Sequence, residues 1–479
     1  MKNRRFIGAV IAALVFGTVA FSAAAATYTL TTFSDPVYTT ITNGTGVITG
    51  GAGVGLVSLR SAIQGAENTA GTHSVTLAAG TYSVTAGEIK MGNTPSENIT
   101  FNGVAVFPPT SIINMAGTTP GSTRDRILFI NTTATTTGVQ TAFNNIKFTN
   151  GNLSSDPYGG GAMRAGGPGN VLNISNCIFD SNALDTANNG GTTGGAINIS
   201  GGGAVTITNS TFNNNSNSNA DGGALYYFFA NNGGLTGTLT VTGCTFSNNQ
   251  GTAPGSGGSS GGAIGIATQG KIGAQTFTAN ILRNTFINNT ANNGEGGAII
   301  INNGEPTYTI NVNFNRFIGN TASHAATSAL GRNPASGSVN ASNNWWASNV
   351  GPVGGSQGAA TVTAGPGTLT TSPWLQLRNS ASPNPILANG TTTVSADILG
   401  LNTGGATAAG NLTGLPTFPT SGTVSSNAVK GTIPGGTIQF VNGAATVLFT
   451  VGATGGLGGL DATADSTTLT APITVNQPP

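Results

Sequence analysis

The apolar residues of this chain recur in a short phrase that ends on an aromatic side chain. Between residues 143 and 349 the phrase occurs seven times, for example as SNCIFDSN at 175–182 and TNSTFNNN at 208–215. From the second copy onward, an asparagine follows the aromatic residue by three positions. Such repetition is typical of a solenoid, in which each copy forms one coil. The aromatic anchors are Phe148, Phe179, Phe212, Phe246, Phe286, Phe317 and Trp346, and the asparagines are Asn182, Asn215, Asn249, Asn289, Asn320 and Asn349.

A second phrase, GGA followed by alternating apolar residues, lies between successive anchors. It stands for example at 194–197 and 261–264, and polar stretches such as 183–193 and 250–260 separate it from the anchor phrases. Alternation with a period of two predicts short strands, whereas variable stretches of Asn, Gly and Ser predict loops.

The phase of the alternation changes just before each anchor, which requires a bend. The residues seven and five positions before an anchor share one face of a strand, and the anchor shares another face with the residue two positions before it. Residues that tolerate a left-handed backbone stand at the bend in most copies. Arg283 and Phe314 break this pattern, so we expect those two turns to differ. The pattern residues are Asn145, Asn176, Asn209, Gly243 and Asn343.

These features predict an all-β fold, a right-handed single-stranded parallel β-helix with three short strands per coil. The repeat of about 31 to 40 residues is long enough for such a coil, and parallel strands joined by crossovers are right-handed in about 98% of cases. Equivalent side chains should then stack about 4.8 Å apart as aromatic, aliphatic and asparagine ladders. The alternative, a β-sandwich, would show strands of similar length at even spacing without a constant phrase.

The two cysteines provide a check on this register. Cys177 and Cys244 both lie two residues before an anchor, and Ser210 holds this position in the coil between them. Two coils correspond to about 9.6 Å between Cα atoms, which exceeds the limit of about 7 Å for a disulfide. We therefore expect two buried free thiols and no disulfide. The competing interpretation is a bridge, the usual arrangement in an exported chain with two cysteines.

The first 26 residues have the features of a secretory signal peptide. Lys2, Arg4 and Arg5 precede an uncharged run from Phe6 to Phe21, and small residues follow at Ala24 to Ala26. The alternative is an uncleaved membrane anchor, but the run is shorter than the ~20 residues of a spanning helix. We expect a secreted, extracellular or cell-surface protein without a membrane span in its mature chain.

The remaining chain divides near residue 376. We assign 27–376 to the β-helix with an N-terminal cap, in which Leu59, Ala62 and Ile63 form an apolar stripe on a helix at about 58–68. In 377–479, strand-like runs alternate with Gly, Pro and Asn turns, and the chain ends in the linker-like VNQPP. This region resembles the small Ig-like modules of bacterial surface proteins, which implies a β-sandwich, although it lacks the Cys-Trp-Cys signature of antibody-type domains.

The alternating GGAI and FxxN phrases resemble the polymorphic outer-membrane protein repeats of secreted bacterial β-helices in the pectin-lyase-like superfamily. LVSLRSAIQGAEN at 56–68 resembles the CSLREA segment that opens many such proteins, with Val57 and Ser61 in place of its Cys and Glu. NNWWASNVGP at 343–352 resembles the closing coil. The resemblance covers roughly residues 50–376 and implies either a surface protein or a polysaccharide-cleaving enzyme.

The low fraction of charged residues limits the classes of molecule that this chain can bind. Charged residues make up 6% of the chain, with 15 basic and 14 acidic side chains, against about 25% charged residues in ordinary globular chains. Nucleic acid is an improbable partner because phosphate binding needs a clustered basic surface. We find no GxSxG, HExxH, P-loop or calcium-repeat motif, and His73 and His324 cannot form a convincing metal site, so we expect no cofactor and no metal.

Catalytic carboxylates are sparse on the predicted outer face. The position after each anchor holds a single carboxylate, Asp180, whereas polysaccharide hydrolysis needs two. Asp221 and Glu295 share one position two coils apart, and their separation of about 10 Å barely reaches the ~6.5–9.5 Å range of inverting hydrolases. We interpret both as solvated loop ends and expect no catalytic residues. A lyase or glycoside hydrolase whose residues come from loops is the alternative.

One strand carries an unusual run of aromatic residues, LYYFF at 225–229. By analogy with the other GGAI strands, Tyr226 and Phe228 face outward and could bind a sugar ring or a protein. The alternative is that a neighbouring loop covers these two side chains. We expect a non-enzymatic protein that acts in adhesion or in envelope or matrix interaction, and whose partner is a glycan or protein on a host or neighbouring cell. A structural or surface-binding role for flat Thr and Asn ladders is a third hypothesis, but no strict TxT array supports it.

Overall fold

The computed structural model describes residues 25–478 except for a set of short internal segments. The predicted signal peptide, 1–26, lies almost wholly outside the described residues. The segments left out are 93–97, 117–125, 131–138, 154–158, 167–168, 185–192, 219–220, 231–235, 254–257, 270–273, 304, 306, 324–328, 333–336, 353–359, 363–367, 417–421, 428–430 and 433–437.

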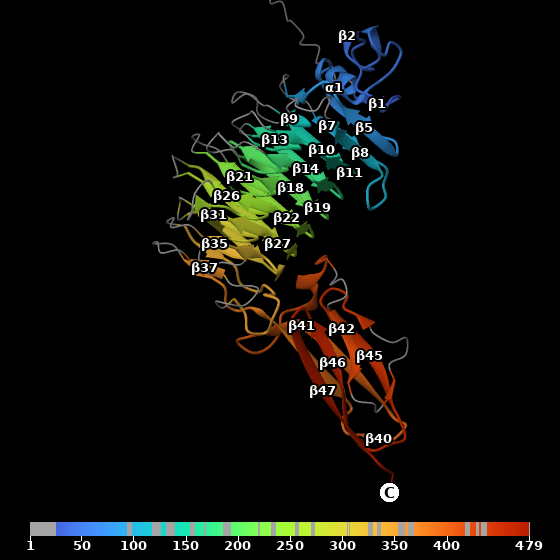
Figure 1. Ribbon diagram of the computed structural model, residues 1–479, viewed down its shortest axis with the longest axis vertical. Helices are drawn as coiled ribbons and strands as arrows, with labels where there is room; N and C mark the ends of the chain where they lie inside the picture. The colour runs from blue at the N-terminus through green and yellow to red at the C-terminus, as the bar shows by residue number, and fades with distance from the viewer. Residues whose placement is uncertain are drawn as a thin grey trace, which may run out of the picture.

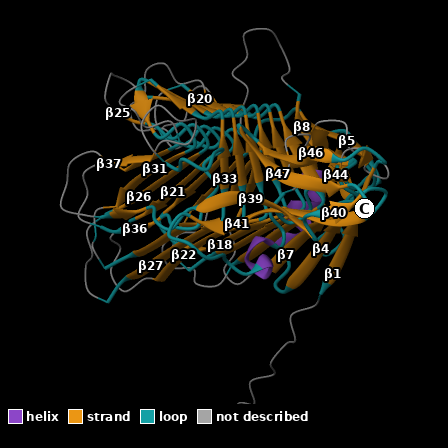
Figure 2. Cartoon of the chain, turned by 90° about the horizontal axis from the view of Figure 1, so that it is seen from below, coloured by secondary structure: helices purple, strands orange, loops and turns teal. Residues whose placement is uncertain are grey.

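The chain is all-β, and most of it forms long parallel sheets along which successive coils stack (Figure 1). This arrangement agrees with the predicted parallel β-helix, and we call the stacked coils the solenoid. Figure 2 shows the strands of successive coils in parallel rows. A central coil contributes one strand to each of four sheets, A to D, so the prediction of three strands per coil misses a short fourth strand. One such coil consists of β10 (Gln140–Asn144), β11 (Ile146–Thr149), β12 (Asn152–Leu153) and β13 (Met163–Gly166).

Sheets A and B meet at the predicted bend. Besides β10, sheet A contains β1 (Ala26–Thr29), β4 (Thr72–Thr76), β7 (Asn98–Asn102), β14 (Val171–Ser175), β18 (Gly203–Thr208), β22 (Thr236–Thr242), β27 (Thr276–Leu282), β32 (Thr309–Asn313), β36 (Val339–Asn340) and β38 (Leu369–Thr370). Besides β11, sheet B contains β5 (Gly80–Val84), β8 (Ser111–Met115), β15 (Ile178–Asp180), β19 (Thr211–Asn213), β23 (Thr245–Ser247), β28 (Thr285–Ile287) and β33 (Arg316–Ile318).

Sheets C and D complete the coils. Besides β12, sheet C contains β16 (Ala183–Leu184), β20 (Ser216–Asn217), β24 (Gln250–Thr252), β29 (Thr290–Asn292) and β34 (Thr321–Ala322). Besides β13, sheet D contains β6 (Ile89–Met91), β9 (Leu128–Ile130), β17 (Ile197–Ser200), β21 (Leu225–Phe229), β26 (Ile264–Thr268), β31 (Ile299–Asn303), β35 (Leu330–Arg332) and β37 (Ala360–Val362). Two small pairs lie outside these sheets: β2 (Tyr38–Ile41) with β3 (Ile48–Gly51), and β25 (Gly258–Ser259) with β30 (Gly294–Glu295).

The aromatic anchors form one continuous column inside the solenoid. The ring centroids of neighbouring anchors from Phe148 to Trp346 lie 4.6–5.1 Å apart, and their planes differ by no more than 12°. The rings are fully buried. Stacked strands repeat at about 4.8 Å, so one aromatic residue per coil fills the column without a gap.

The asparagines form a buried ladder beside the aromatic column. The side-chain amide of Asn215 donates to the Oδ1 of Asn249 at 2.9 Å and to the carbonyl oxygen of Phe179 at 2.9 Å. The same pattern links Asn182, Asn215, Asn249, Asn289 and Asn320. Asn349 does not follow the prediction of a sixth ladder member: it binds the backbone of Leu377. The chain leaves the solenoid at this point, so the next segment, rather than a next coil, satisfies its amide.

The bends are uniform, contrary to the expectation for Arg283 and Phe314. Their φ angles are +56° and +59°, close to the +48° to +58° of the asparagines at the same position. The backbone N–H of each bend residue donates to a carbonyl of the next coil, as from Phe314 to Asn343 at 3.0 Å. This contact between coils imposes the left-handed backbone even on residue types that disfavour it.

The cysteine position continues into a second buried polar column. Cys177, Ser210 and Cys244 accept or donate hydrogen bonds along the stack, and Asn284, Asn315 and Asn344 continue it in the later coils. Both cysteines are buried and free in this structure. Burial raises the pKa of both thiols to about 12. They are therefore uncharged and unreactive at neutral pH.

A short helix closes the N-terminal end of the solenoid. Helix α1 (Leu59–Glu67) lies within the predicted range and buries Leu59, Ala62 and Ile63 in the same hydrophobic core as the first coils. Ser58 caps the helix, and the Ser61 hydroxyl accepts a hydrogen bond from the backbone N–H of Ser58 at 2.9 Å. Ser61 thus completes a capping box at the position where the resembling motif has a glutamate.

The C-terminal module consists of two sheets that share a hydrophobic core beyond the last coils (Figure 1). Trp345, next to the last anchor, belongs to this core. One sheet contains β39 (Leu375–Ser382), β41 (Thr391–Leu401), β45 (Ala444–Val451) and β43 (Gly431–Thr432). The other contains β40 (Ile386–Leu387), β47 (Thr467–Asn476), β46 (Gly456–Ala464), β42 (Gly422–Asn427) and β44 (Ile438–Gln439), and a 3-10 helix, η1, spans Ala409–Leu412.

Candidate functional site

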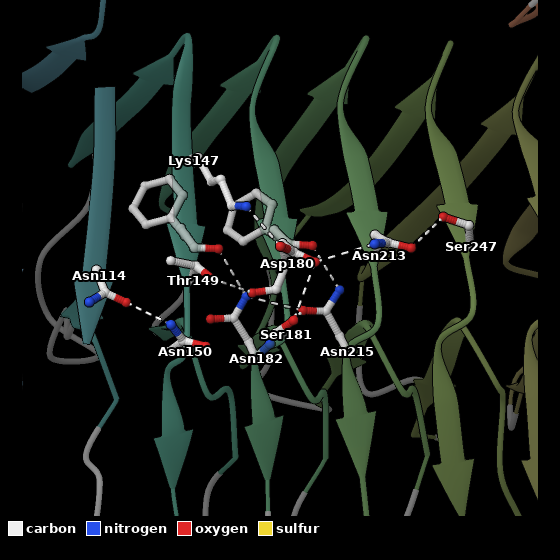
Figure 3. Close-up of polar contacts among 12 residues, drawn as sticks. Asn114, Lys147, Thr149, Asn150, Asp180, Ser181, Asn182, Asn213, Asn215 and Ser247 are labelled. Carbon is white, nitrogen blue, oxygen red and sulfur yellow. Dashed lines mark hydrogen bonds and ion pairs between the residues drawn. The ribbon is translucent and has the colours of Figure 1, made fainter. Parts of the chain in front are cut away.

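A row of polar side chains follows the anchors on the outside of sheet B (Figure 3). Lys147 forms an ion pair with the Asp180 carboxylate at 2.8 Å, and the Thr149 hydroxyl donates to the Asp180 carbonyl at 2.9 Å. The row continues as Asn213 donates to Asp180 at 3.3 Å and Ser247 donates to Asn213 at 2.9 Å. Thr149, Asp180, Asn213 and Ser247 come from consecutive strands, β11 to β23, because the outward position after the anchor repeats in each coil. Lys147 lies before the anchor of its coil and reaches Asp180 from there.

This outer row binds its own members. Asp180 accepts from Lys147, Asn213 and Ser181, so its carboxylate is occupied by neighbours rather than paired with a second carboxylate. A carboxylate in such a network stabilises the surface and has no partner group for acid–base cleavage of a sugar bond. The row does not form a catalytic dyad.

The predicted aromatic patch lies on the outer face of sheet D. Leu225, Tyr227 and Phe229 are buried in the core, whereas Tyr226 and Phe228 face away from it and are half-buried. The small residues Gly265 and Ala267 lie beside these two aromatic rings in the next coil. A Cβ atom at Gly265 would come within 2.9 Å of the Tyr226 ring, so this ring lies directly over the glycine. Tyr226 and Phe228 therefore form an aromatic surface bordered by small residues.

A buried carboxylate lies beside this surface. Asp221 precedes the GGA phrase of the same coil, and a Cβ atom at Gly265 would lie 2.9 Å from its Cβ. Its Oδ2 accepts from Asn302 at 2.9 Å, and its Oδ1 has no hydrogen-bond partner among the described residues. Burial raises the pKa of Asp221 to about 7, although the bond from Asn302 opposes this shift. Burial raises the pKa of Tyr226, and the nearby Asp221 charge raises it further. The prediction that Asp221 is a solvated loop end is therefore wrong.

The Asp221 carboxyl group makes the stability of the fold depend on pH. Its pKa is higher in the folded chain than in the unfolded chain, where it is about 4, so the folded state loses stability as pH rises from about 4 to about 7. We expect Asp221→Asn to raise the free energy of unfolding by about 2 kcal/mol at pH 8 and to leave it nearly unchanged at pH 4. Urea unfolding of the parent chain and the variant at pH 4 and pH 8 measures both changes in the free energy of unfolding.

Asp180→Asn is the matched control for this prediction. It removes a partly exposed ion pair with Lys147, so it should give no gain at pH 8. A gain as large as that of Asp221→Asn, or an Asp221→Asn effect of equal size at pH 4 and pH 8, would contradict the assignment.

The other candidate residues do not assemble into a site. Glu295 is buried and packs over Gly331 of the next coil, so the prediction that it is a solvated loop end is also wrong. His73 is buried against the N-terminal cap, where its Nε2 lies 2.6 Å from the Thr69 carbonyl oxygen. His324 lies outside the described residues. Within the described ranges, no three His, Cys, Asp or Glu side chains cluster closely enough to hold a metal ion.

Sequence reasoning missed the polar groups that join the C-terminal module to the solenoid. Arg316 forms a buried ion pair with Asp465, and the Trp345 indole N–H donates to the same carboxylate at 2.7 Å. Arg316 and Asp465 are 149 positions apart. The sequence contained one signal for this contact, because Arg316 stands where the neighbouring coil has Thr285. Nothing in the sequence identified Asp465 as its partner.

No protein-family model matches this chain, and no curated protein matches it either. Among the described residues, no helix is long and apolar enough to cross a membrane.

Proposed function

We propose that this chain is a secreted or cell-surface protein without enzymatic activity, which acts in adhesion or in envelope or matrix interaction. In this proposal the solenoid is a right-handed β-helix that presents binding surfaces, and the C-terminal module is an Ig-like spacer. The repeat resemblance, the signal-peptide pattern at 1–26 and the polar, nearly uncharged sequence support it.

The observation that carries the proposal is that the polar side chains of the outer row bind one another. Asp180, the carboxylate of that row, forms an ion pair with Lys147 and hydrogen bonds with its neighbours (Figure 3). Hydrolysis of a polysaccharide requires two cooperating carboxylates. A row with one carboxylate, which is held by its neighbours, supports a non-enzymatic surface better than a cleavage site.

The proposed contact surface is the aromatic pair Tyr226 and Phe228. Each ring has an apolar face that can stack on a pyranose ring or on an apolar side chain of a protein, and Tyr226 adds a hydroxyl group. The Tyr226 ring lies over Gly265 of the next coil, and Phe228 stands beside Ala267. The proposed partner is a glycan or protein on the surface of a host or neighbouring cell.

A glycan array with the full chain tests this surface. The parent chain should bind at least one class of glycan, and Tyr226→Ala/Phe228→Ala should weaken that binding at least about tenfold. The control is Leu387→Ala/Leu457→Ala, which removes two exposed apolar side chains from the C-terminal module. Equal binding by the parent and the aromatic double variant would remove the patch from the proposal.

The alternative function is a polysaccharide lyase or glycoside hydrolase, and the raised pKa of Asp221 favours it. A carboxyl group that titrates near pH 7 is suited to donate or accept a proton. The same full chain should be incubated with pectins and uronate polymers, and reducing ends and unsaturated products measured. Turnover that Asp221→Asn abolishes would establish the enzyme, whereas turnover that survives Asp180, Asp221 and Glu295 substitution would place the site elsewhere.

A further inference from the structure

A cleft of about 300 Å³ lies between the side of the solenoid and the C-terminal module. Its floor is the corner between sheets A and B, where Asn176, Asn209 and Gly243 form three successive bends. Gly414, just after η1, lies so close that a Cβ atom at Gly243 would be 3.2 Å from its carbonyl oxygen. Residues from three distant parts of the chain thus meet at one place.

Two apolar residues, Phe107 and Pro416, line the cleft. Phe107 belongs to the loop between β7 and β8, and 58% of its surface is exposed. Pro416 belongs to the C-terminal module. An aromatic side chain that remains this exposed in the folded chain is suited to contact a ligand. The cleft volume lies at the lower end of the roughly 300–1,000 Å³ range of small-molecule sites, which occur preferentially at domain interfaces.

The floor provides hydrogen-bonding groups that the protein itself does not use. The side-chain amides of Asn176 and Asn209 and the hydroxyls of Thr211 and Thr245 line the cleft. Within the described part of the chain, these four side chains form no side-chain hydrogen bond. The other asparagine columns differ, because each amide of the buried ladder binds the next coil. Several donors and acceptors are therefore free to bind a ligand.

The glycine at bend 243 helps to keep the cleft open. Asparagine occupies the bend at 145, 176 and 209, whereas glycine occupies it at 243. A side chain at Gly243 would meet both the Gly414 carbonyl and the Asn209 amide, whose Oδ1 would lie 2.6 Å from the added Cβ. Glycine at this bend keeps the Asn209 amide accessible and lets the module approach the corner.

We propose that this cleft binds a neutral saccharide unit. Among the described residues, nine line the cleft; they carry amides, hydroxyls, one aromatic ring and one proline, and none of these nine is charged. A pyranose presents an apolar face to an aromatic ring and hydroxyl groups to amides at its edge, which matches this lining. A uronate, a phosphate or an acidic peptide would find no cation among these residues. The inference deepens the proposed function, because it names a sugar class and a second contact site on the same surface protein.

Ligand-observed NMR on the full chain tests this proposal. The probes are the methyl glycosides of glucose, galactose, mannose and N-acetylglucosamine, with the methyl glycoside of galacturonic acid, which keeps a free carboxylate, as the charged comparator. At least one neutral glycoside should bind with a Kd below about 10 mM, and Phe107→Ala should weaken it at least about tenfold. Asn209→Gly should weaken binding about fivefold, because glycine preserves the positive φ of this bend and removes the amide.

The Leu387→Ala/Leu457→Ala variant is the matched control, because it removes two exposed apolar side chains that do not line the cleft, and it should bind the glycoside like the parent chain. Loss of binding in the cleft variants but not in this control supports the cleft site. Loss in Tyr226→Ala/Phe228→Ala but not in Phe107→Ala would overturn the cleft and leave the aromatic patch of the proposed function intact. No neutral glycoside binding, or equal binding of the galacturonic acid glycoside, would also overturn the inference.

Discussion

Replacing Asp465 with asparagine is expected to lower the free energy of unfolding by about 3 kcal/mol and to loosen the C-terminal module from the solenoid. The Asp465 carboxylate and the Arg316 guanidinium are almost fully buried, and Trp345 donates to the same carboxylate. Asparagine tolerates the positive φ of this position but leaves the Arg316 charge buried without its counterion. Urea unfolding measures the loss of stability, and small-angle X-ray scattering measures the spread of module positions.

The exposed pair of Arg378 and Asp397 provides the control for this experiment. Arg378 is 46% exposed in its side chain, so Asp397→Asn should cost less than about 1 kcal/mol. If the two variants lose equal stability, the buried pair does not hold the module in place. The double variant Arg316→Met/Asp465→Asn should recover part of the loss, because it leaves no unpaired charge and keeps a residue that tolerates the positive φ of position 465.

Replacing Asn249 with leucine is expected to cost about 3 to 5 kcal/mol of stability. Asn249 accepts from the backbone N–H and the side-chain amide of Asn215, and its own amide donates to the Phe212 carbonyl at 3.0 Å. Leucine removes the partners of the Asn215 backbone N–H and of the Phe212 carbonyl, and it leaves the Asn215 amide only its bond to the Phe179 carbonyl. Because coils stabilise one another along a solenoid, the midpoint of thermal unfolding should fall as well. Circular dichroism with urea and with heating measures both effects.

Asn213→Leu is the matched control for the ladder. Asn213 belongs to the outer row of the preceding coil, where Asp180 and Ser247 are partly exposed and water can replace the lost hydrogen bonds. Its substitution should cost less than about 1 kcal/mol. A similar loss for Asn213→Leu and Asn249→Leu would show that the buried ladder contributes no more than the surface row.

The aromatic column could be predicted because each coil returns the chain to the same environment. Phe179, Phe212 and Phe246 stack at 4.6–4.9 Å, as their common place in the repeated phrase indicates. The bends show the limit of reading residue types one at a time. Arg283 and Phe314 adopt the same left-handed backbone as the asparagines because hydrogen bonds between coils set the bend. Phe314 also packs against the core of the C-terminal module.

The second polar column could not be predicted from the sequence, because its residue type changes along the stack. Cys177, Ser210 and Cys244 are replaced by asparagines in the last coils, yet the hydrogen bonds from coil to coil continue. The backbone places a polar group at each step, and thiol, hydroxyl and amide oxygen or sulfur can all accept there. Asn349 shows the reverse case: it matches the ladder phrase but binds the C-terminal module.

The sequence by itself determined the all-β class, the stacking of coils, the aromatic column, the free cysteines and the outward direction of Tyr226 and Phe228. These features depend on local alternation and on a repeat, and both are written in neighbouring residues. Only the tertiary structure decided the short fourth strand, the burial of Asp221, the pairing of Arg316 with Asp465 and the cleft beside Phe107. Those features join segments that no repeat relates, and their contacts depend on how the C-terminal module and the loops pack against the coils.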